Sequence, residues 1–170
     1  MNSKLVTAIN RQINEEFYSA YLYLAFAAQA ATMKLPGISH WFTVQYQEEL
    51  DHAMGFFKYL ILRRVNIELE IIKKPAVKIT TVSQLFNASL KHEQYITGTI
   101  HNLFELANSQ KDHATAAFLQ WYIDEQVEEE SSVQNIIDQL KMIGDNLTAL
   151  LILDNQLTKR EYKQASILNR

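Results

Sequence analysis

Residues 47–52 read Gln-Glu-Glu-Leu-Asp-His and lie in the middle of a segment in which apolar residues recur every three or four positions. That spacing is the period of an amphipathic helix. On this helix Glu49 and His52 fall in the same inward stripe as Phe42 and Phe56. A carboxylate or an imidazole in such a stripe needs a compensating partner, because unpaired charges are rarely buried.

The same kind of interruption recurs in three further periodic segments. Steps of four and three residues along each predicted helix place these polar residues in the inward stripes: Glu16; Gln45, Glu49 and His52; Glu93; and Gln126 and Glu129. A separation of 77 residues relates Glu16 to Glu93, Glu49 to Gln126, and His52 to Glu129. This offset predicts two similar helical hairpins, and a rise of about 1.5 Å per residue puts all the polar positions near one level.

Glycine and proline are scarce, with four and two copies, so the turns between helices can be located directly. The helices are expected over about residues 3–33, 38–65, 83–108 and 112–143, followed by a short fifth helix over about 146–158. Ser83 and Asp112 are the expected N-caps, and Gly144 is expected to end the fourth helix. Residues 67–82 are rich in β-branched side chains, contain Pro75 and are expected to be extended.

The lengths of the connections predict the arrangement of the helices. Short loops make the first and second helices antiparallel neighbours, and likewise the third and fourth. The extended connection can reach about 50 Å, and the second helix is about 42 Å long, so the second and third helices are expected to be parallel. The predicted fold is one all-α domain over residues 1–170. It is a four-helix bundle with one long crossover and a short C-terminal fifth helix.

The composition excludes several classes of function. The 16 basic and 19 acidic residues give a formal charge of −3, too balanced for a nucleic-acid groove or an anionic membrane surface. The absence of cysteine excludes a disulfide scaffold, a thiolate metal site and a cysteine nucleophile. The first residues show no signal-peptide pattern, and no apolar run reaches the length of about 18 residues that a membrane span needs. We therefore expect a cytoplasmic protein.

The inward polar set has no cation of its own, since it consists of Glu16, Glu49, His52, Glu93, Gln126 and Glu129. Two carboxylates about 4 Å apart repel by about 4 kcal/mol at an effective dielectric constant of about 20. A buried salt-bridge network is the alternative, but it needs a Lys or Arg that this set lacks. Protonation or a metal must relieve the repulsion, and a metal also explains the histidine. Oxygen-rich ligands with one imidazole suit iron or manganese.

The arrangement of these ligands is typical of di-iron carboxylate bundles. Such a centre takes one Glu from each of two helices and a Glu-x-x-His motif from each of the other two. Glu49 and His52 form one such motif, whereas residues 126–129 read Gln-Val-Glu-Glu in place of the second. The predicted centre is therefore asymmetric.

At these residues the chain resembles the bacterial non-haem ferritins. The matching stretches are Gln-Ile-Asn-Glu-Glu-Phe-Tyr-Ser at 12–19, Gln-Glu-Glu-Leu-Asp-His at 47–52, His-Glu-Gln at 92–94 and Phe-Leu-Gln-Trp-Tyr-Ile-Asp-Glu-Gln-Val-Glu-Glu-Glu at 118–130. The likeness covers nearly the whole chain. It implies a ferritin-like fold and iron storage with ferroxidase activity, in which O₂ or H₂O₂ oxidises Fe(II) to Fe(III). The iron would then be stored as a mineral inside a homo-oligomeric shell of twenty-four subunits.

The resemblance also implies roles for individual residues. One iron would be held by Glu16, Glu49 and His52. Glu49 would bridge to a second iron held by Glu93 and, more loosely, by Gln126, with Tyr23 beside the centre. A third iron site would lie next to these two, formed by Glu48, Glu125, Glu128 and Glu129.

The chain departs from its relatives at several positions. Leu50 stands where haem-binding relatives carry Met, and the second Glu-x-x-His is incomplete, so no haem is expected. Leu119 and Ala116 stand where animal ferritins carry acidic residues that line a threefold iron pore. The second helix ends in Arg63 and Arg64 rather than in an acidic mineral-nucleating face. The iron pore and the mineral-facing residues are therefore left unassigned.

The predicted fifth helix is apolar on most sides, with Leu147, Leu150, Leu151, Ile152, Leu153 and Leu157. A monomer would expose this surface, so we expect it to be buried between subunits. Phe17, Tyr21 and Leu24 add apolar surface on a second face of the first helix. The alternative is that the fifth helix folds back on its own bundle.

Two other functions stay open at the level of sequence. A di-iron oxygenase or peroxidase acting on an organic substrate or on peroxide would use a similar centre, but it would need a redox partner domain or a substrate channel. A small iron-buffering or signalling bundle would bind iron without turnover. Exposure of the metal-free protein to Fe(II) and air separates these functions from storage.

Overall fold

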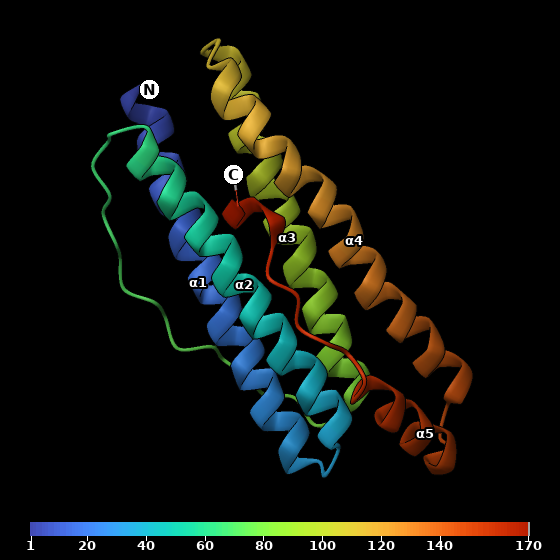
Figure 1. Cartoon of the computed structure of the whole chain (residues 1–170). Helices are drawn as coiled ribbons and strands as arrows, with labels where there is room; N and C mark the ends of the chain where they lie inside the picture. Colours follow the sequence, from blue (N-terminus) through green and yellow to red (C-terminus); the bar gives the residue numbers. More distant parts are fainter. Residues whose placement is uncertain (170) are drawn as a thin grey trace.

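The computed structural model describes residues 1–169, which form helices joined by loops (Figure 1). The elements are α1 (Ser3–Thr32), α2 (Pro36–Leu62), α3 (Val82–Ser109), α4 (His113–Ile143), α5 (Leu147–Leu157) and a 3₁₀ helix η1 (Ser166–Asn169). No β-strand occurs within the described residues. The predicted all-α fold, with four long helices and a short fifth one, is confirmed.

The four long helices form two antiparallel hairpins, α1 with α2 and α3 with α4, packed side by side (Figure 1). Residues 63–81 connect the hairpins without helix or strand and run back along α1. Two side chains of α1 hold this crossover, because Asn10 donates to the carbonyl of Asn66 (3.2 Å) and Gln29 donates to that of Ile79 (2.9 Å). The crossover returns the chain to the start of the bundle, so α2 and α3 are parallel as predicted.

Two helix starts differ from the prediction. α2 begins at Pro36 rather than near residue 38, because proline lacks an N–H that the first helical turn would leave unpaired in any case. α3 begins after Thr81, so the prediction of Ser83 as its N-cap was wrong. The Thr81 hydroxyl accepts from the Gln84 N–H, and the Gln84 side chain accepts from the Thr81 N–H, both at 3.2 Å. This reciprocal capping box fixes the start of α3.

Other predicted boundaries agree with the structure or lie close to it. Asp112 caps α4 through a hydrogen bond from the Thr115 N–H (3.1 Å). Gly144 follows the last residue of α4 with a φ of 54°, a left-handed conformation that glycine adopts without steric cost. α2 ends at Leu62, earlier than expected, and Arg64 turns the chain with a φ of 55°.

The hydrophobic core consists of two clusters rather than one. The first contains Tyr23, Phe26, Phe42, Phe86 and Val133 among its buried side chains. The second contains Ile9, Ile13, Phe56, Ile100 and Leu119. On every long helix the residues between these clusters include buried polar side chains, among them Glu16, Glu49, Glu93 and Gln126. The bundle therefore has a polar layer enclosed between two apolar ones.

α5 packs partly on its own bundle, as the alternative expectation held. The Asp154 carboxylate accepts from the Ile38 N–H at the start of α2 (2.8 Å), and Leu153 is buried. The opposite side stays accessible in the single chain, where Leu147, Leu151 and Ile152 are 74%, 60% and 56% exposed. Burial of this exposed side between subunits stays a prediction. Among the residues described, the structure contains no helix with the length and apolar character of a membrane span.

Gly55 on α2 is where the polar layer meets the second apolar cluster. A Cβ at this position would overlap the Tyr122 hydroxyl, which donates to the carbonyl of His52 (2.9 Å), and would crowd Ile167. We expect Gly55→Ala to lower the free energy of unfolding by about 1–3 kcal/mol, the usual cost of overpacking. Thermal or urea unfolding measures this change.

Gly98 is a matched control, because it also lies inside a helix but a Cβ there meets no atom within 4 Å. Gly98→Ala should stabilise the protein by about 0.5–1 kcal/mol, since alanine loses less backbone entropy on folding. Equal effects of the two substitutions would contradict this account of Gly55.

Candidate metal centre

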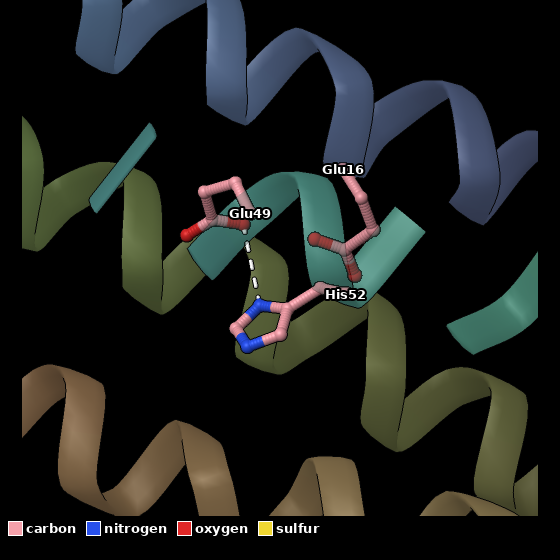
Figure 2. A group of neighbouring side chains, drawn as sticks. All are labelled: Glu16, Glu49 and His52. Atoms are coloured by element: carbon pink, nitrogen blue, oxygen red, sulfur yellow. Dashed lines mark ion pairs between the residues drawn. The ribbon is translucent and has the colours of Figure 1, made fainter. Parts of the chain in front are cut away.

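Glu16, Glu49 and His52 meet inside the polar layer (Figure 2). Each offers one ligand atom, and these atoms lie within 4.8 Å of one another. All three residues are buried. Glu49 and His52 can face Glu16 together because residues three apart lie on the same face of a helix. The His52 Nδ1 atom is 3.4 Å from a carboxylate oxygen of Glu49.

Neutral donors orient this cluster. Gln12, one turn before Glu16, donates from its amide to one carboxylate oxygen of Glu16 (2.9 Å). The Tyr122 hydroxyl holds the backbone of His52, and the rings of Trp121 and Tyr122 lie edge-on to the imidazole, at centroid distances of 5.6 and 6.1 Å. The side chains are thus positioned by groups that leave the negative charge of the carboxylates uncompensated.

Glu93 lies in the same buried layer and is held from two other helices. The Tyr23 hydroxyl on α1 donates to Glu93 and also contacts the hydroxyl of Ser89 (3.0 Å). Gln126 on α4 donates from its amide to a Glu93 carboxylate oxygen (3.2 Å) and to the Thr97 hydroxyl (3.2 Å). Gln126 is therefore beside the carboxylate with which the sequence grouped it, and Tyr23, expected beside the centre, contacts the same carboxylate.

A second group of potential ligands adjoins the first. His52, Glu125 and Glu129 also offer atoms within 4.8 Å of one another, with Glu125 half-buried and Glu129 buried. Gln45 donates to a carboxylate oxygen of Glu129 (2.8 Å). His52 is shared by both groups, so it connects the two ligand sets.

The two remaining residues assigned to a third site lie differently. Glu128 is exposed and belongs to neither of the two ligand groups. Glu48 is half-buried and forms an ion pair with Arg160, with 2.5 Å between the guanidinium nitrogen and the carboxylate oxygen. Glu48 lies outside the inward set that was predicted to lack a cation, and the sequence did not predict its pairing with Arg160. Arg160 follows the fifth helix, outside the four helices from which the set was drawn.

Several buried side-chain atoms of the polar layer have no hydrogen-bond partner among the described residues. They are one oxygen of Glu16, the Nε2 atom of His52 and the amide oxygen of Gln45. Buried polar atoms are normally satisfied, and exceptions call for an unseen partner such as an ion. Unpartnered carboxylate and imidazole atoms in one buried layer fit the preferences of an iron or manganese ion.

Comparisons with known proteins identify the family. The sequence profile of the ferritin-like domain matches residues 6–143. The chain belongs to the ferritin family. Bacterial non-haem ferritins of Staphylococcus epidermidis and Staphylococcus aureus are 35% and 34% identical to this ferritin over 164 residues, which cover 96% of this chain and 99% of each relative.

Solved structures show the same fold. A novel open-pore ferritin of the hyperthermophilic archaeon Archaeoglobus fulgidus matches this ferritin with a TM-score of 0.93 and 43% identity, covering 95% of this chain and 99% of that one. A closed form of the Archaeoglobus ferritin, engineered by mutagenesis, gives a TM-score of 0.94 and 43% identity, covering 96% and 99%. The family and fold that the sequence motifs predicted are therefore confirmed.

Sequence reasoning assigned no role to three residues that shape the site of this ferritin, although it placed one of them, Gln45, in the inward stripe. Gln45 and Gln12 each lie four residues before a ligand, one helical turn away. That spacing could have identified them as donors to the layer. Arg160 carries no such signal, because it lies in a segment without helical periodicity and reaches Glu48 only through the folded chain.

Burial makes the ionised carboxylates of this ferritin unfavourable in the metal-free state. Burial first, and then the nearby charge of Glu49, raises the pKa of Glu16 to about 8. Burial and the charge of Glu129 raise the pKa of Glu93 to about 8. Burial and the charge of Glu93 also raise the pKa of Glu49 well above its ordinary value. Metal-free ferritin therefore binds protons in this layer at neutral pH.

These shifts predict how the stability of the metal-free protein depends on pH. Between the ordinary pKa of 4.5 and the folded value of about 8, Glu16 and Glu93 bind more protons in the folded state than in the unfolded state. The free energy of unfolding should therefore fall as the pH rises through this window. From pH 6.5 to 8 we expect a loss of about 1–2 kcal/mol for each group, measured as a lower melting temperature at pH 8.

Glu16→Gln is the control, because it removes one of these groups and should flatten the dependence. Burial lowers the pKa of His92 to about 4 from 6.5, which acts in the opposite direction but only below pH 6.5. A melting temperature that stays constant or rises between pH 6.5 and 8 would contradict the assignment.

Proposed function

We propose that this chain is an iron-storage ferritin that oxidises Fe(II) at Glu16, Glu49, His52 and Glu93, with Gln126 as a weaker fifth ligand. Membership of the ferritin family and the ferritin fold support iron storage. The observation that carries the ferroxidase part is the buried cluster of Glu16, Glu49 and His52, in which two ligand atoms have no hydrogen-bond partner among residues 1–169.

The ligand set suits oxidation of iron in pairs. Each Fe(II) gives up one electron, so two neighbouring ions supply the two electrons that reduce O₂ to H₂O₂ with uptake of two protons. The negative carboxylates favour Fe(III) over Fe(II), because the higher charge gains more from them. Glu16 and Glu93, whose pKa values are raised to about 8, release protons within the layer when metal binds.

The two iron positions of the proposed centre differ in the charge of their ligands, so they would differ in their affinity for iron. The first iron would be bound by two carboxylates and an imidazole, and Glu49 would share its second oxygen with the neighbouring iron. The second iron would have one carboxylate of its own, Glu93, and the neutral amide of Gln126. With less negative charge, the second position would bind iron more weakly and release it first. Tyr23 would hold the carboxylate of Glu93 in place.

We further propose a third iron position at Glu125 and Glu129, with Glu48 and Glu128 at its edge. The support is the second ligand group, which adjoins the first through His52. Iron leaving the paired positions would pass this group on its way to the store. The expected store is a mineral core inside a cytoplasmic homo-oligomeric shell of twenty-four subunits, and the exposed side of α5 and the exposed Tyr21 and Leu24 supply apolar surface for its contacts.

The test is to mix the metal-free protein with Fe(II) in air and to follow both oxidation and the iron retained by the sized particle. We expect rapid oxidation and hundreds of irons per particle in the native protein. Glu49→Ala should abolish the rapid phase while the particle stays intact, because it removes the bridging carboxylate. Binding without oxidation would instead support an iron buffer.

Glu105→Ala is the matched control, because Glu105 is an exposed glutamate of α3 outside the polar layer. It should oxidise iron at the native rate. Native-rate oxidation in Glu49→Ala as well would refute the assignment of the bridging ligand.

Gln126→Glu tests the weaker half of the centre. The substitution places a second carboxylate beside Glu93, where the amide now donates at 3.2 Å. The second metal ion should bind more tightly by about tenfold, since one more negative charge faces it. The melting temperature of the metal-free variant should fall through the added repulsion. Anaerobic titration with Fe(II) measures the first effect, and unchanged affinity would indicate that Gln126 serves packing alone.

A further inference from the structure

The segment after α5 carries the one cation that contacts the carboxylates around the centre among the described residues. Arg160 donates to a Glu48 carboxylate oxygen at 2.5 Å, and its guanidinium group lies over the Trp41 ring at 4.6 Å from the centroid. The Arg160 and Glu48 side chains are only 23% and 19% exposed. A charge-assisted contact in such a sheltered position is stronger than an ordinary surface ion pair.

The backbone that carries Arg160 is fixed at several points along α2. The carbonyl of Arg160 is paired with the Nε2 atom of His40 (2.8 Å). Asp51 accepts from the Tyr162 hydroxyl (2.7 Å) and from the Ala165 N–H (2.8 Å). In Figure 1 this segment runs from α5 back along the bundle beside α2. Arg160 is thus held over Glu48 by a fixed backbone.

The far end of the segment is anchored on α4 and in the core. The Trp121 indole N–H donates to the Ser166 hydroxyl (2.9 Å), and Ile167 is buried in the second apolar cluster. Removal of the Arg160 side chain therefore leaves the path of the segment supported by its other contacts. The guanidinium group itself is held by its contacts with Glu48 and Trp41, and one of its buried nitrogens has no partner among the described residues.

Glu48 is a neighbour of the carboxylates proposed for the third iron. Glu48 lies four residues before His52, on the same face of α2 as this shared ligand. Burial raises the pKa of Glu48 to about 7, the charge of Arg160 lowers it, and the charges of Glu129 and Glu125 raise it. The Glu48 carboxylate can therefore pair with either of two cations. One is the guanidinium of Arg160, and the other is a metal ion bound by Glu125 and Glu129. They repel each other when both are present.

We propose that Arg160 is a built-in counter-cation of the third iron site, which occupies Glu48 until an incoming metal ion displaces it. The inference rests on the proposed function, because it presupposes the third iron position. Arg160 is a positioning residue that lowers the affinity of this position for metal. Iron held weakly there passes on to the store, whereas iron held tightly would stay.

The test is a calorimetric titration of the metal-free protein with Zn²⁺, which binds nitrogen and oxygen ligands without redox chemistry. We expect each subunit of the native protein to bind two Zn²⁺ equivalents tightly and a third, the weaker equivalent, with lower affinity. Arg160→Ala should tighten the weaker equivalent by about tenfold, because the competing cation is gone. Arg160→Lys should restore most of the native value. An unchanged weak equivalent in Arg160→Ala would overturn the inference.

Lys159→Ala is the matched control, because it removes the same charge from the adjacent residue, whose side chain is exposed. It should leave the weaker equivalent unchanged, and an effect as large as that of Arg160→Ala would overturn the inference in favour of a general charge effect. Melting temperatures of all variants show whether the fold is retained.

A double-mutant cycle with Glu48→Gln decides whether Arg160 acts through Glu48. The tenfold gain of Arg160→Ala should disappear in the Glu48→Gln background, and a gain that persists there would overturn the inference. If the native protein failed to bind the two tighter Zn²⁺ ions, the proposed function would be refuted, and this inference with it. The two failures are therefore distinguishable.

Discussion

The burial of a layer of carboxylates between two apolar clusters is the constraint on which the rest of the structure depends. Glu16, Glu49, Glu93 and Glu129 are each at most 5% exposed. Ionised carboxylates at such positions repel one another and lose their hydration. An α-helix satisfies its backbone hydrogen bonds within itself, so a helical bundle can contain this layer without losing secondary structure. The apolar clusters on both sides supply the packing that offsets its cost.

The donors around the layer are neutral, so they add no positive charge that would compete with a metal ion. Gln12, Gln45 and Tyr23 each donate a hydrogen bond to one carboxylate, so they fix the orientation of a side chain without neutralising it. A lysine or arginine in their place would compensate the charge permanently and compete with any metal ion. The cation that the structure does provide, Arg160, lies at the edge of the layer on Glu48, where its partly exposed side chain can be displaced.

The two hairpins share one pattern but differ where the chemistry is proposed. The offset of 77 residues relates Glu49 to Gln126 and His52 to Glu129, so one hairpin contributes a carboxylate and an imidazole where the other contributes an amide and a carboxylate. His52 then belongs to both ligand groups, whereas Gln126 is bonded to Glu93 and Thr97. The two hairpins therefore contribute different charges at corresponding positions. The proposed order of iron binding and release follows from this difference in charge.

The sequence by itself determined the four helices, their order and the polar layer, because each depends on periodicity and on the length of a connection. The spacing of Glu49 and His52, and the offset of 77 residues that relates Glu16 to Glu93, identified residues that the folded chain does bring into one buried layer. Local details near helix ends were less predictable, as the capping of α3 by Thr81 shows, since Ser and Thr two residues apart offer similar hydroxyls. The ion pair of Arg160 with Glu48 was decided by tertiary structure alone. It joins residues 112 positions apart through an irregular segment, and no periodic pattern encodes such a contact.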